Sequence, residues 1–85
     1  MKKIRIFTTA YCGYCSAAKN VLSEKGLQFE AIDVSGDSAT RQKASDKAGG
    51  FRTVPMIFVG ETFVGGHSDL VAKIKSGEFQ KLVND

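Results

Sequence analysis

The pattern of hydrophobic and polar positions along the chain predicts strands that alternate with helices. Short apolar runs bounded by glycine, proline or polar residues are typical of strands, and apolar residues three or four apart are typical of one helix face. Four segments are predicted as strands: residues 3–8, 27–34, 56–59 and 62–64. Three segments are predicted as helices: residues 13–25, residues from 37 or 38 to about 48, and residues from 68 or 69 to Gly77.

Glycines mark the ends of these segments. Gly26 follows the first helical stretch and can adopt the left-handed conformation that ends a helix. Gly49-Gly50 ends the second helix, whose thin apolar face consists mostly of alanines, so we expect it to pack loosely on the sheet. Gly60-Glu61 forms a tight turn, which makes the last two strands a hairpin. Phe79, Leu82 and Val83 can add a short terminal turn over the core.

The order of these elements predicts an α/β fold. A right-handed crossover through the first helix makes the first two strands parallel, and the hairpin adds an antiparallel pair. The expected architecture is therefore a four-stranded mixed sheet flanked by helices in the order βαβαββα. With 85 residues, 42% of them hydrophobic, the chain is expected to form a single globular domain over residues 1–85.

Composition and charge exclude several function classes. No apolar run approaches the roughly 20 residues needed to span a membrane, so we expect no membrane association. Residues 1–6 lack the long apolar stretch and cleavage site of a signal peptide, and a cytoplasmic location is expected. The net charge is +3, with basic residues scattered among acidic ones. This argues against a nucleic-acid partner and is compatible with a small anionic one.

Two cysteines, Cys12 and Cys15, lie three residues apart between the first predicted strand and the first helix. A thiol in the first turn of a helix faces unpaired N–H groups and the positive end of the helix dipole, both of which favour the thiolate. The second cysteine lies within reach, so the pair can close and reopen a disulfide. We expect Cys12 to be the exposed nucleophile and Cys15, one turn inside, to be shielded.

The sequence gives less support to two other interpretations of the cysteine pair. A zinc site needs four ligands, and beyond the two cysteines the chain offers only His67, so no metal site is predicted. A purely structural disulfide would close too short a loop to stabilise much, and cytosolic proteins rarely carry one. Redox chemistry is therefore the preferred interpretation.

Three segments of the chain together resemble the dithiol class of the glutaredoxin family, whose members have the thioredoxin fold. They are Tyr11-Cys12-Gly13-Tyr14-Cys15, Arg52-Thr53-Val54-Pro55 and Gly65-Gly66-His67-Ser68-Asp69-Leu70, and the resemblance covers essentially the whole chain. Thioredoxin itself fits less well, because that family usually has Trp-Cys-Gly-Pro-Cys and this chain has no tryptophan.

The resemblance implies a glutathione-dependent thiol–disulfide oxidoreductase. Such an enzyme reduces protein–glutathione mixed disulfides and protein disulfides through its Cys-Gly-Tyr-Cys site, with Cys12 and Cys15 as the catalytic residues. Glutathione is the expected co-substrate, and glutathionylated or disulfide-containing proteins are the expected partners. The chain is expected to be a monomer unless it binds a cluster.

The resemblance also implies where glutathione binds. Tyr14 would border the groove, and a cis-Pro55 would aim the backbone of Val54 at the substrate. Backbone N–H groups at the start of the last helix would take the γ-glutamyl carboxylate, Asp69 the adjacent amine, and Arg52 the glycyl carboxylate. The implied glutathione-binding residues are Tyr14, Arg52, Thr53, Val54, Pro55, Gly66, Ser68 and Asp69.

Without the resemblance, these residues have simpler interpretations. Tyr14 is then a surface tyrosine and Pro55 a residue that opens a strand. Ser68 and Asp69 are then an ordinary helix cap, a role compatible with ligand binding. His67 is interpreted as a solvent-facing residue near the groove.

Two positions depart from the family pattern. Many glutaredoxins have lysine where this chain has Thr9, so Arg52, with Arg41 or Gln42, would have to hold the glycyl carboxylate without it. Gly13 stands where proline is commonest, and some members with a small residue there bind a [2Fe–2S] cluster between two subunits. A cluster carrier or sensor is therefore the main alternative function. A thioredoxin-like electron donor reduced by a flavoenzyme is disfavoured by the groove residues.

Overall fold

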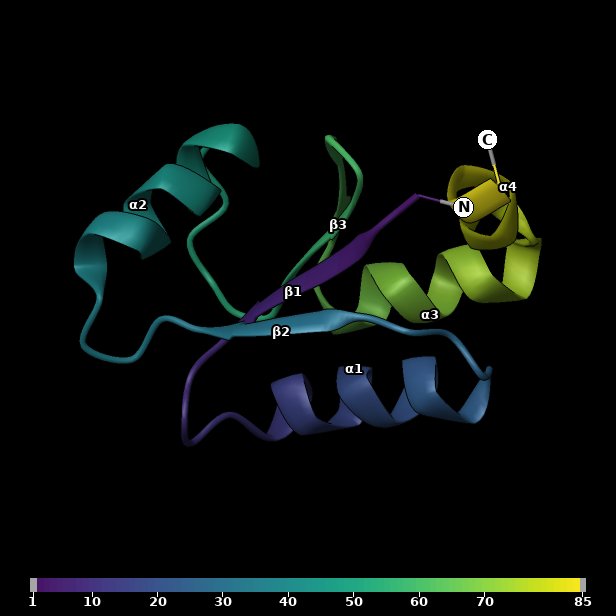
Figure 1. The fold of residues 1–85 in the computed structure, drawn as a ribbon, viewed down its shortest axis with the longest axis horizontal. Helices are drawn as coiled ribbons and strands as arrows, with labels where there is room; N and C mark the ends of the chain where they lie inside the picture. The colour runs from purple at the N-terminus through teal and green to yellow at the C-terminus, as the bar shows by residue number, and fades with distance from the viewer. Residues whose placement is uncertain (1, 85) are drawn as a thin grey trace.

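The computed structural model describes residues 2–84, so Met1 and Asp85, the two ends of the predicted domain, lie outside the described residues. Figure 1 shows the chain as a small sheet with helices on both sides. The elements, in chain order, are β1 (Ile4–Thr8), α1 (Gly13–Glu24), β2 (Glu30–Asp33), α2 (Ser38–Lys47), β3 (Met56–Val59), β4 (Thr62–Gly65), α3 (His67–Ser76) and α4 (Glu78–Asn84).

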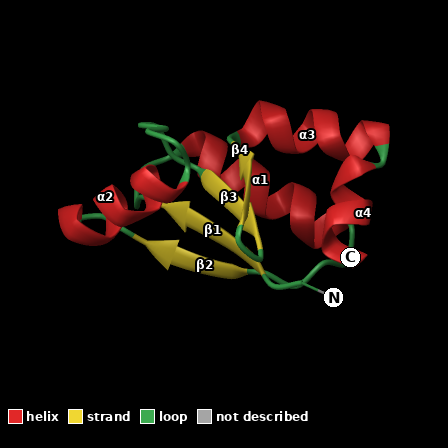
Figure 2. Cartoon of the chain, turned by 90° about the horizontal axis from the view of Figure 1, so that it is seen from above, coloured by secondary structure: helices red, strands yellow, loops and turns green. Residues whose placement is uncertain are grey.

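The four strands form one mixed sheet in the order β2-β1-β3-β4, seen from above in Figure 2. β1 and β2 are parallel, with Ile6 opposite Ala31. β3 is antiparallel to both β1 and β4, and Ile6 also lies opposite Ile57. The predicted parallel pair and the predicted hairpin are confirmed. β1 lies between β2 and β3 and ends at Thr8. The loop that follows it therefore leaves the sheet at the carboxyl end of an inner strand.

The main core lies on the face of the sheet covered by α1, α3 and α4. Alternate residues of a strand point to opposite faces, and Ile4 and Ile6 of β1 point to this side. They pack with buried side chains from the three helices and from β3: Ala18, Leu22, Ile57, Val59, Leu70, Phe79 and Val83. This continuous apolar layer fixes the starts of α1 and α3 relative to the sheet.

The opposite face is covered by α2 and by aromatic side chains. Phe7, Phe58 and Phe63 project from the strands, and Phe51 joins them from the loop before β3. Successive ring centroids lie 5.7 Å apart for Phe7 and Phe58, 5.1 Å for Phe58 and Phe63, and 5.1 Å for Phe51 and Phe63. Ala44 of α2 is buried against this cluster.

α2 is held by its N-cap and by a small apolar face. Asp37 is the N-cap, and its carboxylate accepts from the backbone N–H of Thr40 at 3.1 Å and from its hydroxyl at 2.7 Å. Of the predicted alanine face, Ala44 is buried and Ala48 half-buried, but Ala39 is exposed.

Most predicted boundaries agree with the structure to within one residue, and the start of β2 is the exception. β2 begins at Glu30 rather than at residue 27. The backbone N–H of Leu27 still bonds to the carbonyl of Leu22, so the chain is completing the end of α1 there and cannot yet pair with β1. α3 begins at His67 rather than at 68 or 69, because Gly66 is its N-cap.

The C-terminal segment is a helix rather than a short turn. α4 covers Glu78–Asn84, and Phe79 and Val83, four residues apart, are both fully buried against the main core. The observed order is therefore βαβαββαα. No helix within the described part of the chain is long and apolar enough to cross a membrane.

Candidate active site

Cys12 ends the loop after β1 and is the N-cap of α1. Its backbone is extended (φ −125°, ψ 108°), which turns the side chain back over the first helical turn. There the sulfur accepts a hydrogen bond from the backbone N–H of Cys15 at 3.1 Å. The residue is half-buried, so the sulfur is supported by the helix end and still reachable from outside. A sulfur in this position gains from the helix dipole when it is ionised.

Cys15 lies one turn further on, on the core-facing side of α1 with Ala18 and Leu22. Only 1% of its surface is exposed. Burial raises the pKa of the Cys15 thiol from the ordinary 9.0 to about 11, and the hydrogen bond with Cys12 acts in the same direction. Cys15 is therefore a protonated, shielded thiol at neutral pH, and Cys12 is the accessible one. Both cysteines are free in this structure.

The raised pKa of Cys15 predicts a loss of stability in alkali. A thiol that ionises less readily in the folded chain contributes stability below the unfolded pKa, and this contribution is lost as the pH rises towards the folded value. We expect the reduced protein to lose on the order of 2 kcal/mol between pH 9 and about 11 from this group. Urea unfolding of wild type and Cys15→Ser across this range checks it, since other titrating groups cancel in the difference. Parallel curves for the two proteins would contradict it.

The loop before β3 faces Cys12. The Val54–Pro55 peptide bond is cis, as the resemblance implied, and Pro55 is buried. The thiol of Cys12 donates to the carbonyl of Val54 at 3.8 Å, so these two segments, 42 residues apart in the sequence, are in contact. Arg41 of α2 also contacts this loop: its guanidinium donates to the carbonyl of Arg52 at 3.1 Å.

The start of α3 forms the other side of the site. Gly66 is the N-cap, and its backbone N–H donates to the carboxylate of Asp69 at 3.0 Å. Asp69 is thus the third helical residue and closes back over the cap, while Ser68 and Asp69 both remain exposed. Gly66 is buried against Phe51, whose ring would lie 3.5 Å from a Cβ at that position.

These segments enclose a groove of about 420 Å³ beside Cys12. Its walls come from the first turn of α1, the loop before β3 and the first turn of α3: Tyr14, Phe51, Thr53, Val54, Pro55, Gly66, His67, Ser68 and Asp69. All the predicted glutathione-binding residues except Arg52 line it. Phe51 and His67 were not predicted to line it: no motif in the sequence includes Phe51, and His67 was placed near the groove but facing solvent.

Arg52 lines a neighbouring groove of about 560 Å³ together with residues of α2, among them Arg41 and Gln42. The structure therefore brings together the three side chains expected to compensate for Thr9, which lines neither groove. A separate cleft of about 300 Å³ near Lys2, Leu27 and Phe29 lies at the opposite end of β1 from Cys12. Among residues 2–84, no group of three or more histidine, cysteine or acidic side chains could hold a metal ion.

Comparison with known proteins decides the family. The glutaredoxin family model matches residues 4–64, which include both cysteines and the Thr53–Pro55 loop. The chain belongs to the glutaredoxin family. A glutaredoxin of Pseudomonas aeruginosa is 42% identical over 84 residues, covering 99% of each chain. Glutaredoxin 3 of Escherichia coli is 36% identical over 83 residues, covering 98% of this chain and 99% of that one.

Solved glutaredoxins share the whole fold. The crystal structure of a buckwheat glutaredoxin–glutathione complex superimposes with a TM-score of 0.86 at 27% identity, covering 98% of this chain and 77% of the buckwheat chain. The predicted thioredoxin fold is thereby confirmed. As a glutaredoxin, the protein is a thiol–disulfide oxidoreductase.

Proposed function

We propose that this glutaredoxin uses glutathione to reduce protein–glutathione mixed disulfides and protein disulfides, with Cys12 as the attacking sulfur. The observation that carries the proposal is the contact between the Cys12 thiol and the Val54 carbonyl, which puts the accessible sulfur at the wall of the groove. The buckwheat relative that shares the fold was solved as a glutathione complex, which supports the same ligand here.

Removal of glutathione from a protein needs only Cys12. Its thiolate attacks the glutathione sulfur of the mixed disulfide, a new Cys12–glutathione bond forms, and the protein thiolate leaves and takes a proton from water. A second glutathione thiolate then attacks the glutathione sulfur bonded to Cys12. Oxidised glutathione leaves, and the Cys12 thiolate is regenerated, still accepting from the backbone N–H of Cys15.

Reduction of a protein disulfide uses both cysteines. Cys12 attacks one sulfur of the substrate and forms a mixed disulfide, and one substrate thiol is released. Cys15 attacks the Cys12 sulfur and its proton passes to the departing substrate sulfur, which releases the second substrate thiol and leaves a Cys12–Cys15 disulfide. Two glutathione molecules reduce this disulfide and leave as oxidised glutathione. In the reduced protein the raised pKa of Cys15 keeps this thiol protonated at neutral pH.

Charges in the groove and in the neighbouring groove at Arg52 suit the two ends of glutathione. The γ-glutamyl carboxylate suits the N-terminus of α3, where backbone N–H groups and the helix dipole favour an anion. The adjacent amine suits the exposed carboxylate of Asp69, which is already oriented by the backbone N–H of Gly66. The glycyl carboxylate suits Arg52, with Arg41 and Gln42 beside it.

We expect Arg52→Ala and Asp69→Ala each to raise KM for a glutathionylated substrate. A charge-assisted contact is worth about 1.5–3 kcal/mol when desolvated and less at an exposed rim, so for these exposed residues we expect about a two- to tenfold rise. Thr9→Lys should lower KM modestly, because it adds the usual family cation. The measurement is a glutathione-coupled reduction assay.

Two controls separate charge from folding. Asp69→Asn keeps an oxygen that can accept from Gly66 but removes the charge, so it should raise KM nearly as much as Asp69→Ala with less effect on Tm. Lys75→Ala, an exposed cation in the last turn of α3, should leave KM unchanged. If Arg52→Ala and Asp69→Ala both keep the wild-type KM, glutathione does not bind in this groove.

The cluster-binding alternative stays a prediction. Of the two cysteines, only Cys12 is accessible, so each chain would supply one ligand and the rest would come from outside it. At Gly13 a Cβ would meet nothing within 4 Å, so the residue after Cys12 is unobstructed, which is permissive for such an assembly without favouring it.

A further inference from the structure

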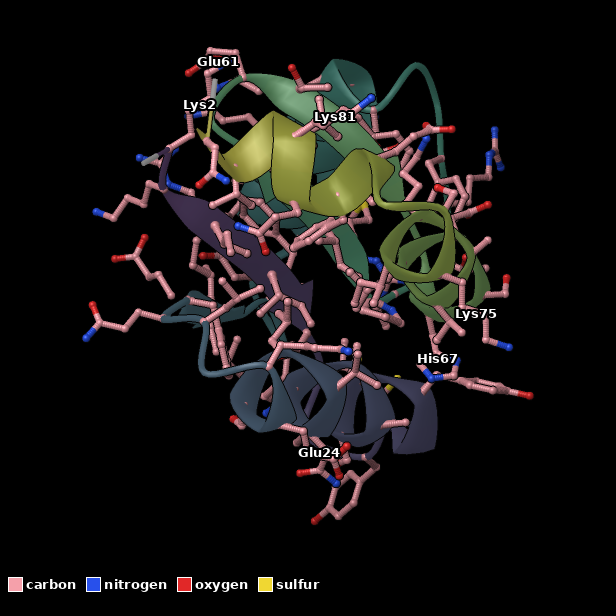
Figure 3. The ribbon with its side chains drawn as sticks, turned by 90° about the vertical axis from the view of Figure 1, so that its right-hand side faces the viewer. Lys2, Glu24, Glu61, His67, Lys75 and Lys81 are labelled. Carbon is pink, nitrogen blue, oxygen red and sulfur yellow. The ribbon has the colours of Figure 1, made fainter. Side chains whose placement is uncertain are left out.

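Tyr14 and His67 form an aromatic pair at the groove. Their ring centroids lie 5.7 Å apart with the ring planes tilted by 36°. Tyr14 belongs to the first turn of α1 and His67 is the first residue of α3, so the pair joins the two helix starts that flank the site. Figure 3 shows the imidazole of His67 between the ribbons of α1 and α3.

The backbones on the two sides of this pair are fixed independently. On the α1 side, the sulfur of Cys12 caps the helix through the N–H of Cys15. On the α3 side, the N–H of Gly66 donates to Asp69, and the carbonyl of Gly66 accepts from Leu70 at 3.0 Å. The backbones at the starts of α1 and α3 therefore already place the two rings against each other.

The Tyr14 ring has little other support. Tyr14 is 69% exposed, whereas His67 is half-buried in the groove wall. Tyr11, the only other tyrosine, is fully exposed. An exposed tyrosine turns freely about two side-chain bonds and must lose that freedom when it contacts a ligand.

We propose that His67 is a positioning residue that holds the Tyr14 ring at the mouth of the groove before glutathione arrives. The proposal rests on the glutathione groove described above. Holding the ring in advance removes part of the ordering cost of binding, so it strengthens binding of the glutathione moiety. It leaves the sulfur chemistry unchanged, because His67 acts through Tyr14 and not on Cys12.

The steady-state test is a cycle of single and double variants. We expect His67→Ala and Tyr14→Ala each to raise KM for a glutathionylated substrate about two- to tenfold, the range for one aromatic pair, with kcat unchanged. His67→Phe, which keeps a ring, should restore most of the affinity. The double variant should be no worse than Tyr14→Ala alone, because His67 then has no ring to hold. Fully additive effects, or no effect of His67→Ala, would overturn the proposal.

A second measurement tests the contact itself and does not depend on activity. The chain has one histidine and two tyrosines, so their ring signals in NMR spectra are few and separable. We expect cross-peaks between the Tyr14 and His67 rings in the free protein, and a shift of the Tyr14 ring signals in His67→Ala with those of Tyr11 unchanged. Tyr14 signals that do not respond to His67→Ala would overturn the proposal.

Asp69→Ala separates this proposal from the proposed function. If Asp69→Ala raises KM and His67→Ala does not, glutathione binds in the groove and only the role of His67 is wrong. If neither raises KM, the groove itself is wrong and both proposals fall together.

Discussion

Replacing Cys12 with serine should abolish both deglutathionylation and protein-disulfide reduction, with losses of more than about a thousandfold. Of the two cysteine thiols, Cys12 carries the accessible one, since Cys15 is 1% exposed and its pKa is raised to about 11. A serine hydroxyl at position 12 can still cap α1 through the N–H of Cys15, so the variant should fold. Thermal unfolding with a Tm close to wild type confirms that the loss is chemical.

Cys15→Ser is the matched variant, and it should divide the two activities. The hydrogen bond that Cys12 accepts comes from the backbone of residue 15 and survives the change. Deglutathionylation, which needs only Cys12 and free glutathione, should stay largely intact, while direct reduction of protein disulfides should be lost because the chain no longer has its own thiol to resolve the mixed disulfide. Strong deglutathionylation by Cys12→Ser would show that the nucleophile has been assigned to the wrong residue.

Gly65→Ala should both destabilise the protein and weaken the site. Gly65 has φ +130°, a conformation that L side chains rarely adopt, and a Cβ there would lie 2.6 Å from the Cβ of Asp69. The backbone cannot easily shift, because Gly65 ends β4 opposite Ile57 in the sheet. Asp69 must therefore swing away and give up the N–H of Gly66.

The expected loss from Gly65→Ala is about 2–4 kcal/mol, the sum of roughly 1 kcal/mol for the cap and 1–3 kcal/mol for backbone strain. That is a large part of the 5–15 kcal/mol typical of a domain. Urea unfolding measures it, and KM should rise because Asp69 is displaced. Gly13→Ala is the control: a Cβ there meets nothing within 4 Å in the first helical turn, so stability should stay the same or rise slightly.

A double variant tests the stated cause. Gly65→Ala and Asp69→Ala both lose the cap that the Asp69 carboxylate provides, so in Gly65→Ala/Asp69→Ala this loss is counted once. The loss of stability should therefore be smaller than the sum of the two single losses by roughly 1 kcal/mol, although the Cβ of residue 69 still crowds residue 65. Strictly additive losses would mean that Gly65→Ala does not displace the Asp69 carboxylate from its cap.

Local signals in the sequence predicted most elements of the fold, and they failed where tertiary contacts decide a boundary. The start of α2 at Asp37 or Ser38 and the hairpin at Gly60-Glu61 follow from residue types within a few positions of each turn. The start of β2 depends instead on where β1 offers a partner, and Leu27 and Phe29 are apolar because they pack half-buried on the core outside any strand. Apolar alternation alone cannot separate these two reasons for burial.

In the candidate site, too, local motifs were predictable and tertiary contacts were not. Cys12, Cys15 and the Thr53–Pro55 loop belong to short motifs that are visible in the sequence, and the structure brings them together. His67 meets Tyr14 across 53 residues, and Phe51 reaches the groove through its contact with Gly66. No periodicity links such positions, so only the folded chain shows that they share one groove.

The most direct test of the central claim is an NMR structure of the Cys15→Ser variant with glutathione disulfide-bonded to Cys12. Removing the resolving thiol traps the proposed intermediate with the rest of the groove unchanged. The account predicts contacts between the glutathione backbone and Val54, between its γ-glutamyl end and Ser68 and Asp69, and between its glycyl end and Arg52. Glutathione that is attached to Cys12 but shows no contact with these residues, or that attaches elsewhere, would contradict it.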